Sequence, residues 1–161
     1  MTSHIPNIAV YADVQNLYYT TRDAYGKSLN YRAVMQRIRA QGNIVCATAY
    51  AIERDDNKQR QFQDALRHTG FDVKLKPYIQ RSDGSAKGDW DVGITIDMMC
   101  VPSAVDTVVL LSGDGDFALL LEKINQDYGV RTEVYGVRSL TAQSLINAAS
   151  VYHPIGGDLL L

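Results

Sequence analysis

The sequence predicts a three-layer α/β/α sandwich on a mostly parallel sheet of five or six strands. Short apolar, β-branched runs alternate with helix-like segments along the chain, as in a parallel sheet covered on both faces. The 161 residues fit one compact domain. Hydrophobic residues make up 46% and charged residues 21%, which excludes a disordered or fibrous class. We therefore expect a single domain over residues 1–161.

Strands are predicted where short apolar runs end at polar or glycine-rich positions. They are placed at Ile8–Asp13, Ile44–Ala51, Phe71–Tyr78, Thr107–Ser112 and Arg131–Gly136. Helices lie between them and are delimited by their capping residues. Asn30 caps a helix that runs to Gln41, and a second runs from Asp56 or Asn57 to Gly70. The others are placed at Trp90–Val101, Phe117–Tyr128 and Leu140–Ala149.

Two segments have unusual composition. Trp90–Val101 is apolar on nearly every side, which predicts a buried helix. Gln80–Gly88 is rich in small and polar residues, which predicts a flexible exposed loop.

Composition also limits the classes of partner. No segment approaches the roughly 20 apolar residues of a membrane span, and the start lacks a signal-peptide pattern, so we expect a cytoplasmic protein without membrane association. The net charge of −2 excludes a strongly basic nucleic-acid-binding domain, but it does not exclude local contact with RNA. Cys46 and Cys100 lie far apart in apolar surroundings, which predicts buried reduced thiols and no zinc site.

Aspartates are predicted to gather at the carboxyl edge of the sheet. Asp13 ends the first strand, and Asp114 and Asp116 follow the fourth, which neighbours the first across the switch point of a doubly wound sheet. Asp91 begins a helix at the same edge. Two carboxylates about 4 Å apart repel by roughly 4 kcal/mol at an effective dielectric of 20, so such a cluster needs a cation. An all-oxygen site favours Mg²⁺ or Mn²⁺, which suits phosphodiester hydrolysis by an activated water.

Each acid also has a structural alternative. Asp116 fits a helix N-cap, Asp91 a partner of the helix dipole and Asp114 a turn residue. Asp97 lies six positions after Asp91, about 120° around the helix, so the two cannot point equally at one metal. Asp97 is interpreted either as an outer metal ligand or as a structural hydrogen-bonding acid.

Polar residues near the aspartates are candidates for substrate binding. Asn16 is predicted to bind a metal water or substrate, with helix capping as the alternative. Lys87 is predicted to meet the scissile phosphate or to stabilise a carboxylate, with a solvated loop residue as the alternative. Ser112 is a further candidate for substrate binding. A set of basic and aromatic residues forms either a track for a single strand or solvated surface: Lys74, Lys76, Tyr78, Arg81 and Lys87.

Three segments resemble the NYN domain family, the LabA-like branch of the PIN-like nucleases, and they occur in family order. They are Ala12-Asp13-Val14-Gln15-Asn16-Leu17, Lys87-Gly88-Asp89-Trp90-Asp91-Val92 with Asp97 following, and Ser112-Gly113-Asp114-Gly115-Asp116-Phe117. The resemblance implies a PIN-like, Rossmann-like fold and an Mg²⁺-dependent ribonuclease site that serves RNA processing or gene regulation. It implies site roles for Asp13, Asp91, Asp114 and Asp116, and also for Asn16, Lys87 and Asp97. Relatives often have an acidic residue where this chain reads Ala148-Ala149-Ser150-Val151.

Other functions stay open. Gly113–Ala118 fits the G-x-G-x-x-G/A dinucleotide-binding pattern, but its two carboxylates would repel a pyrophosphate. A haloacid-dehalogenase-like phosphatase would need its second catalytic aspartate at Gln15. The non-enzymatic alternative is a regulatory RNA-binding or protein-interaction module that retains the acidic pocket. RNA, single-stranded or structured, is the expected partner, and homodimerisation is left open.

Overall fold

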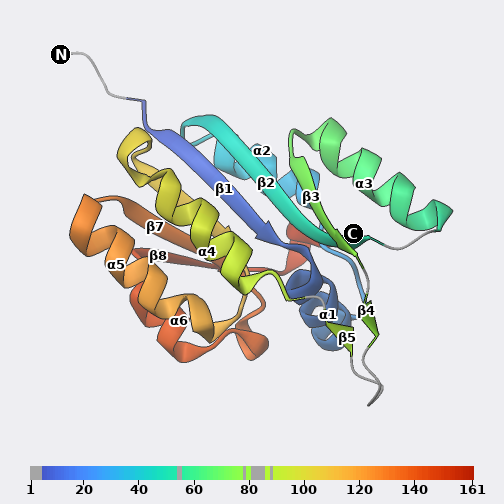
Figure 1. Cartoon of the computed structure of the whole chain (residues 1–161). Coiled ribbons are helices and arrows are strands. Elements are labelled where there is room, and N and C mark those ends of the chain that lie inside the picture. The colour runs from blue at the N-terminus through green and yellow to red at the C-terminus, as the bar shows by residue number, and fades with distance from the viewer. Residues whose placement is uncertain (1–4, 54–55, 78, 81–85, 88) are drawn as a thin grey trace.

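Six strands of the chain form one parallel β-sheet (Figure 1). The computed structural model describes the chain except residues 1–4, 54–55, 78, 81–85 and 88. The strands of the sheet are β1 Asn7–Asp13, β2 Asn43–Glu53, β3 Asp72–Pro77, β6 Thr107–Leu111, β7 Arg131–Gly136 and β8 Val151–Pro154. Their order is β3-β2-β1-β6-β7-β8, and every neighbouring pair is parallel. The predicted α/β fold with a mostly parallel sheet of five or six strands is confirmed, and the sheet has six strands.

Helices cover both faces of the sheet and complete the three layers (Figure 1). One face carries α1 Val14–Tyr25, α2 Tyr31–Arg39 and α3 Asn57–Thr69; the other carries α4 Asp91–Cys100, α5 Ala118–Tyr128 and α6 Gln143–Ala148. Single 3₁₀ turns occur at η1 Pro102–Ala104, η2 Gly115–Phe117, η3 Arg138–Leu140 and η4 Gly157–Leu159. The predicted caps are confirmed, since the side chains of Asn30 and Asp56 accept hydrogen bonds from the backbone N–H groups of Ala33 and Gln59.

The switch point of the sheet lies between β1 and β6. These strands pair directly, from Ile8 opposite Thr107 to Ala12 opposite Leu111. The chain leaves β1 into α1 on one face and leaves β6 toward α5 on the other (Figure 1). The two connections diverge, so the carboxyl ends of β1 and β6 mark the position at which open α/β sheets bind ligands.

The predicted burial of the apolar helix is wrong. In α4 only Ile94 and Met98 are buried, whereas Val92 and Ile96 are 72% and 57% exposed. Cys100, at the end of the same helix, is also exposed. Val92 and Ile96 are exposed because α4 lies in an outer layer of the sandwich and has one side facing solvent. Within the described part of the chain, no helix is long and apolar enough to cross a bilayer.

Two further differences concern short strands. β8 follows α6 directly, and the apolar-run criterion did not place a strand there because the segment is only four residues long and ends in proline. The predicted loop at 80–88 is partly paired, since β4 Ile79–Gln80 and β5 Ala86–Lys87 form a two-stranded antiparallel sheet. The rest of that loop prediction, at 81–85 and 88, lies outside the described residues.

Candidate metal centre

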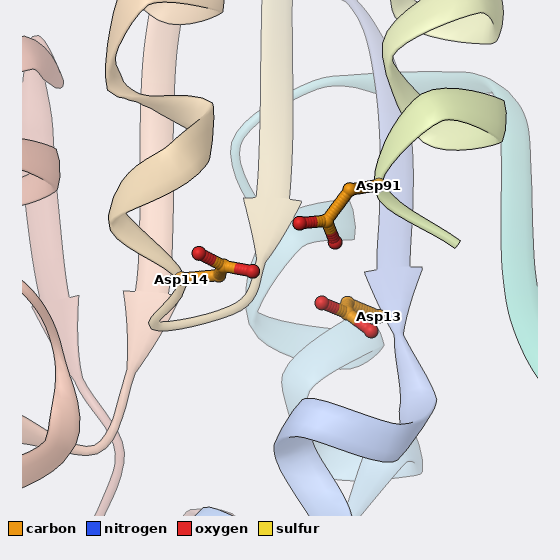
Figure 2. Close-up of side chains that lie close together, drawn as sticks. All are labelled: Asp13, Asp91 and Asp114. Atoms are coloured by element: carbon orange, nitrogen blue, oxygen red, sulfur yellow. The ribbon is translucent and has the colours of Figure 1, made fainter. Parts of the chain in front are cut away.

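Three aspartates from separate segments meet at the carboxyl edge of the sheet (Figure 2). Asp13 ends β1, Asp91 begins α4, and Asp114 lies in the turn between β6 and η2. One carboxylate oxygen from each lies within 4.8 Å of the oxygens of the other two. Figure 2 shows the side chains directed toward a common space. The sequence predicted this convergence from the places of the three residues at strand and helix ends.

Ser112 joins two members of this cluster. Its hydroxyl donates a hydrogen bond to Oδ2 of Asp13 at 3.0 Å and accepts one from the backbone N–H of Asp114 at 3.2 Å. Ser112 is fully buried. Substrate contact was predicted for Ser112, and we correct this to a positioning role because its side chain is sealed from solvent.

Asn16 holds the turn after β6 against α1. Its Oδ1 accepts a hydrogen bond from the backbone N–H of Gly113 at 2.9 Å. On the other side of this turn, a Cβ added to Gly113 would lie 2.7 Å from the carbonyl oxygen of Leu140, so only glycine fits. Close packing therefore accounts for this glycine without a bound pyrophosphate. Asn16, predicted to contact a metal water or substrate, acts here on the turn that carries Asp114.

The cluster favours protonated carboxylates when no cation balances its charge. Burial raises the pKa of Asp13 to about 6, against the hydrogen bond from Ser112, which lowers it. Burial also raises the pKa of Asp91 to about 8, with further contributions from the carboxylates of Asp114 and Asp89. These protons belong to the cluster as a whole, because the groups interact strongly. A divalent cation would displace them, and oxygen-only donors suit a hard cation such as Mg²⁺ or Mn²⁺.

Asp89 is a fourth acid near the cluster that the sequence analysis did not single out. Its Oδ1 accepts a hydrogen bond from the backbone N–H of Asp91 at 2.6 Å, and its charge raises the pKa of Asp13 and Asp91. The same two-residue turn recurs where Oδ1 of Asp114 accepts from the backbone N–H of Asp116 at 2.9 Å. The sequence did carry a signal for Asp89. It lies two residues before Asp91, and aspartate side chains commonly accept a hydrogen bond from the backbone N–H two residues on.

Asp116 lies outside the group of three. Its side chain is exposed, and its backbone N–H donates a hydrogen bond to Oδ1 of Asp114. A role as a further ligand therefore stays a prediction. The alternative of a helix N-cap is wrong, since Phe117 takes the N-cap position of α5.

Asp97 also lies away from the group, about 9 Å along α4 from Asp91 at 1.5 Å per residue. Its Oδ2 accepts hydrogen bonds from the hydroxyl of Tyr50 at 2.7 Å and from Nζ of Lys74 at 2.6 Å. Burial would raise the pKa of Asp97, but these two donors bring it below its usual value. The structure supports the structural interpretation of Asp97 over a place among the metal ligands.

The structure describes the side chains of only two residues of the predicted basic track, Lys74 and Lys76. Lys74 is paired with Asp97, so its charge is already balanced. Lys76 lies closer to the site: its Nζ donates to the carbonyl oxygen of Asp89 at 2.8 Å and lies 4.5 Å from the centroid of the Trp90 ring. Tyr78, Arg81 and the side chain of Lys87 lie outside the described residues, so the predicted roles of Lys87 stay predictions.

Comparison with known proteins gives consistent results. The profile of the NYN domain family matches residues 7–156. The Low amplitude and bright protein LabA of Synechococcus elongatus is 29% identical over 153 residues, which cover 90% of this chain and 81% of LabA. A crystal structure of a protein of unknown function from Vibrio parahaemolyticus is 51% identical, with a TM-score of 0.94 over 100% of this chain and 99% of that one.

A more distant likeness shows the fold alone. A carbohydrate kinase from Agrobacterium tumefaciens is 12% identical, with a TM-score of 0.50 over 91% of this chain and 59% of the kinase. The family match, in contrast, includes every aspartate of the cluster and all six strands of the parallel sheet. The chain belongs to the NYN domain family.

Proposed function

We propose that the protein is a metal-dependent ribonuclease that hydrolyses phosphodiester bonds of RNA at the Asp13, Asp91 and Asp114 cluster. The observation that carries the proposal is the convergence of three carboxylates, from three separate segments, within 4.8 Å of one another. They meet at the carboxyl ends of β1 and β6, the switch point at which open α/β sheets bind their ligands. Membership of the NYN domain family supports an RNA-directed, RNase-like role.

The three aspartates would hold Mg²⁺ or Mn²⁺, and the exposed Asp116 would act as a further ligand through a water molecule. When bound, the cation supplies Lewis-acid chemistry, which makes water a stronger nucleophile and offsets charge on the phosphodiester oxygens. The protein's own contribution is to keep the ligands in place. Ser112 orients Asp13 and the backbone of Asp114, while Asp89 bonds the backbone of Asp91.

The test is cleavage of labelled single- and double-stranded RNA in Mg²⁺, in Mn²⁺ and in EDTA, by the wild type and by Asp13→Asn. The asparagine keeps an oxygen that can accept the hydrogen bond of Ser112, so the fold should survive. Cleavage should fall by several orders of magnitude, because a missing ligand misplaces the cation. RNA binding in EDTA should change much less, because phosphate contacts from Lys and Arg carry most of the affinity.

The matched control is Asp127→Asn. Asp127 lies in the last turn of α5, where it pairs with Lys123 on the surface, and its loss should leave cleavage unchanged. A wild type that cleaves no RNA with any metal, together with unfolding of Asp13→Asn, would overturn the proposal. RNA binding without cleavage would favour the alternative of a regulatory module that retains an acidic pocket.

A further inference from the structure

We propose that Tyr18, Tyr19 and Arg22 on α1 form a platform on which a base of single-stranded nucleic acid stacks beside the acidic cluster. This platform rests on the proposed function for its ligand class, since the base would belong to the strand whose backbone crosses the cluster. The sequence analysis assigned no role to these residues.

The first argument is position. Helix α1 begins directly after Asp13, as the ribbon in Figure 2 shows. Tyr18 and Tyr19 lie about 6 and 7.5 Å along the helix axis from Val14. Side chains on a helix lean toward its N-terminus and cover the preceding turn. Helix geometry therefore places both rings over the first turns of α1, which follow Asp13 in the chain.

The second argument is exposure without a structural need. Tyr18 and Tyr19 are 49% and 54% exposed, while Leu17 and Thr21 supply the buried side of α1. Neither tyrosine belongs to the hydrophobic core. Two adjacent, half-exposed aromatic rings lose water-exposed area when a planar group stacks on them, and every base offers such a face.

The third argument is the charge held at the rings. The guanidinium carbon of Arg22 lies 5.3 Å from the centroid of the Tyr18 ring, and the rings of Tyr18 and Tyr19 meet edge to face at 5.4 Å. Arg22 thus places a cation within reach of the phosphate that accompanies a stacked base. Single-strand-binding surfaces combine these two features, aromatic faces and backbone cations.

The fourth argument is rigidity and continuity with the cluster. The hydrogen bond from Gly113 to Asn16 fixes the first turn of α1 to the segment that carries Asp114, so the platform keeps its distance from the carboxylates. A second aromatic–cation pair adjoins another member of the cluster, since Trp90 directly precedes Asp91 and Lys76 lies over its ring. A strand that crosses the cluster would meet an aromatic–cation pair beside two of its three aspartates.

The experiment measures binding of a short fluorescein-labelled RNA of mixed sequence by anisotropy in EDTA, once single-stranded and once as a duplex. Tyr18→Ala and Tyr19→Ala should each weaken single-strand binding by about tenfold, from the usual loss of one stacked base. Tyr18→Phe and Tyr19→Phe should bind like the wild type, because the ring is retained. Duplex binding should change little, because its bases are covered by their neighbours.

The matched control is Tyr128→Ala, since Tyr128 is 46% exposed at the opposite end of α5 from the cluster. The platform is overturned if the wild type binds no single strand, if the alanine variants bind it like the wild type, or if they lose single-strand and duplex binding equally. Cleavage with Mn²⁺ is measured in parallel. Cleavage by the wild type with unchanged binding by the variants rejects the platform alone, and tyrosine-dependent binding without cleavage rejects the ribonuclease alone.

Discussion

Asp13 keeps a proton more readily than an ordinary aspartate because it is 6% exposed and faces other carboxylates. Its folded-state pKa of about 6 exceeds the ordinary aspartate value of 3.8, and the pKa of Asp91 is raised further, to about 8. Groups with raised pKa values contribute stability that is fully present below about pH 4. This contribution is lost as the pH rises through 6 and then 8. The metal-free protein should therefore become less stable over this range.

The corresponding prediction compares the wild type with Asp13→Asn in EDTA between pH 4 and pH 8. The free energy of unfolding of the wild type should fall relative to that of the variant by up to about 3 kcal/mol, at 1.36 kcal/mol per pKa unit. Urea denaturation at each pH measures the difference, and groups far from the site cancel between the two proteins. Parallel curves across the whole range would show that Asp13 has an ordinary pKa.

Ser112 gives a second prediction at the residue scale. Ser112→Ala removes the donor to the buried Asp13 carboxylate and the acceptor of the Asp114 N–H. Leaving these groups unpaired should cost about 1–3 kcal/mol of stability, and Mn²⁺ affinity measured by calorimetry should fall with the loss of ligand orientation. The exposed Ser103, in η1, offers the control Ser103→Ala. Equal stability and equal Mn²⁺ affinity in both variants would remove the positioning role from Ser112.

Helix α4 carries Asp91 into the site, and Asp97 ties this helix to the sheet. The carboxylate of Asp97 accepts from Tyr50 of β2 and Lys74 of β3, so one side chain joins α4 to two strands. Tyr50 is fully buried, and its hydroxyl would lose this acceptor in Asp97→Ala. We expect a loss of about 1–3 kcal/mol, and a smaller loss in Asp97→Asn, which keeps an acceptor oxygen.

Cleavage separates this role from metal ligation. Both Asp97 variants should cleave RNA at the wild-type rate per folded molecule. Urea denaturation gives the folded fraction of each variant, and the measured cleavage rate is divided by that fraction. The exposed pair of Asp64 and Arg67 on α3 provides the control Asp64→Ala, which should lose little stability. If Asp97→Asn abolished cleavage while its stability held, Asp97 would be a member of the metal centre after all.

The whole molecule should respond to the cation as one cooperative unit. Ligation joins β1, α4 and the segment after β6, and binding to the folded state alone stabilises it by about 2.7 kcal/mol at about 100 times the Kd. For a domain of this size that gain corresponds to a rise in Tm of roughly 5–10 °C. Thermal melting in EDTA, in Mg²⁺ and in Mn²⁺ measures it, and the rise should shrink in Asp13→Asn. Equal Tm values in EDTA and millimolar Mn²⁺ would count strongly against the site.

Local physical chemistry explains what the sequence by itself determined. Apolar runs such as Thr107–Leu111 predict buried parallel strands, and Asn30 and Asp56 predict helix starts, because these preferences act within a few residues. The convergence of Asp13, Asp91 and Asp114 also followed from the sequence, since parallel strands place their carboxyl ends at one edge.

The tertiary structure alone decided which side chains reach the common space. Asp114 turns inward while Asp116, two residues on, is exposed, and Asp97 finds Tyr50 and Lys74 on neighbouring strands. The exposure of one side of α4, and of Tyr18 and Tyr19 on α1, depends likewise on which neighbours cover each helix. The helical repeat and the residue type predict the direction of a side chain only relative to the axis of its own helix. Its partners come from segments distant in sequence, and packing of the complete sheet and its two helical layers selects them.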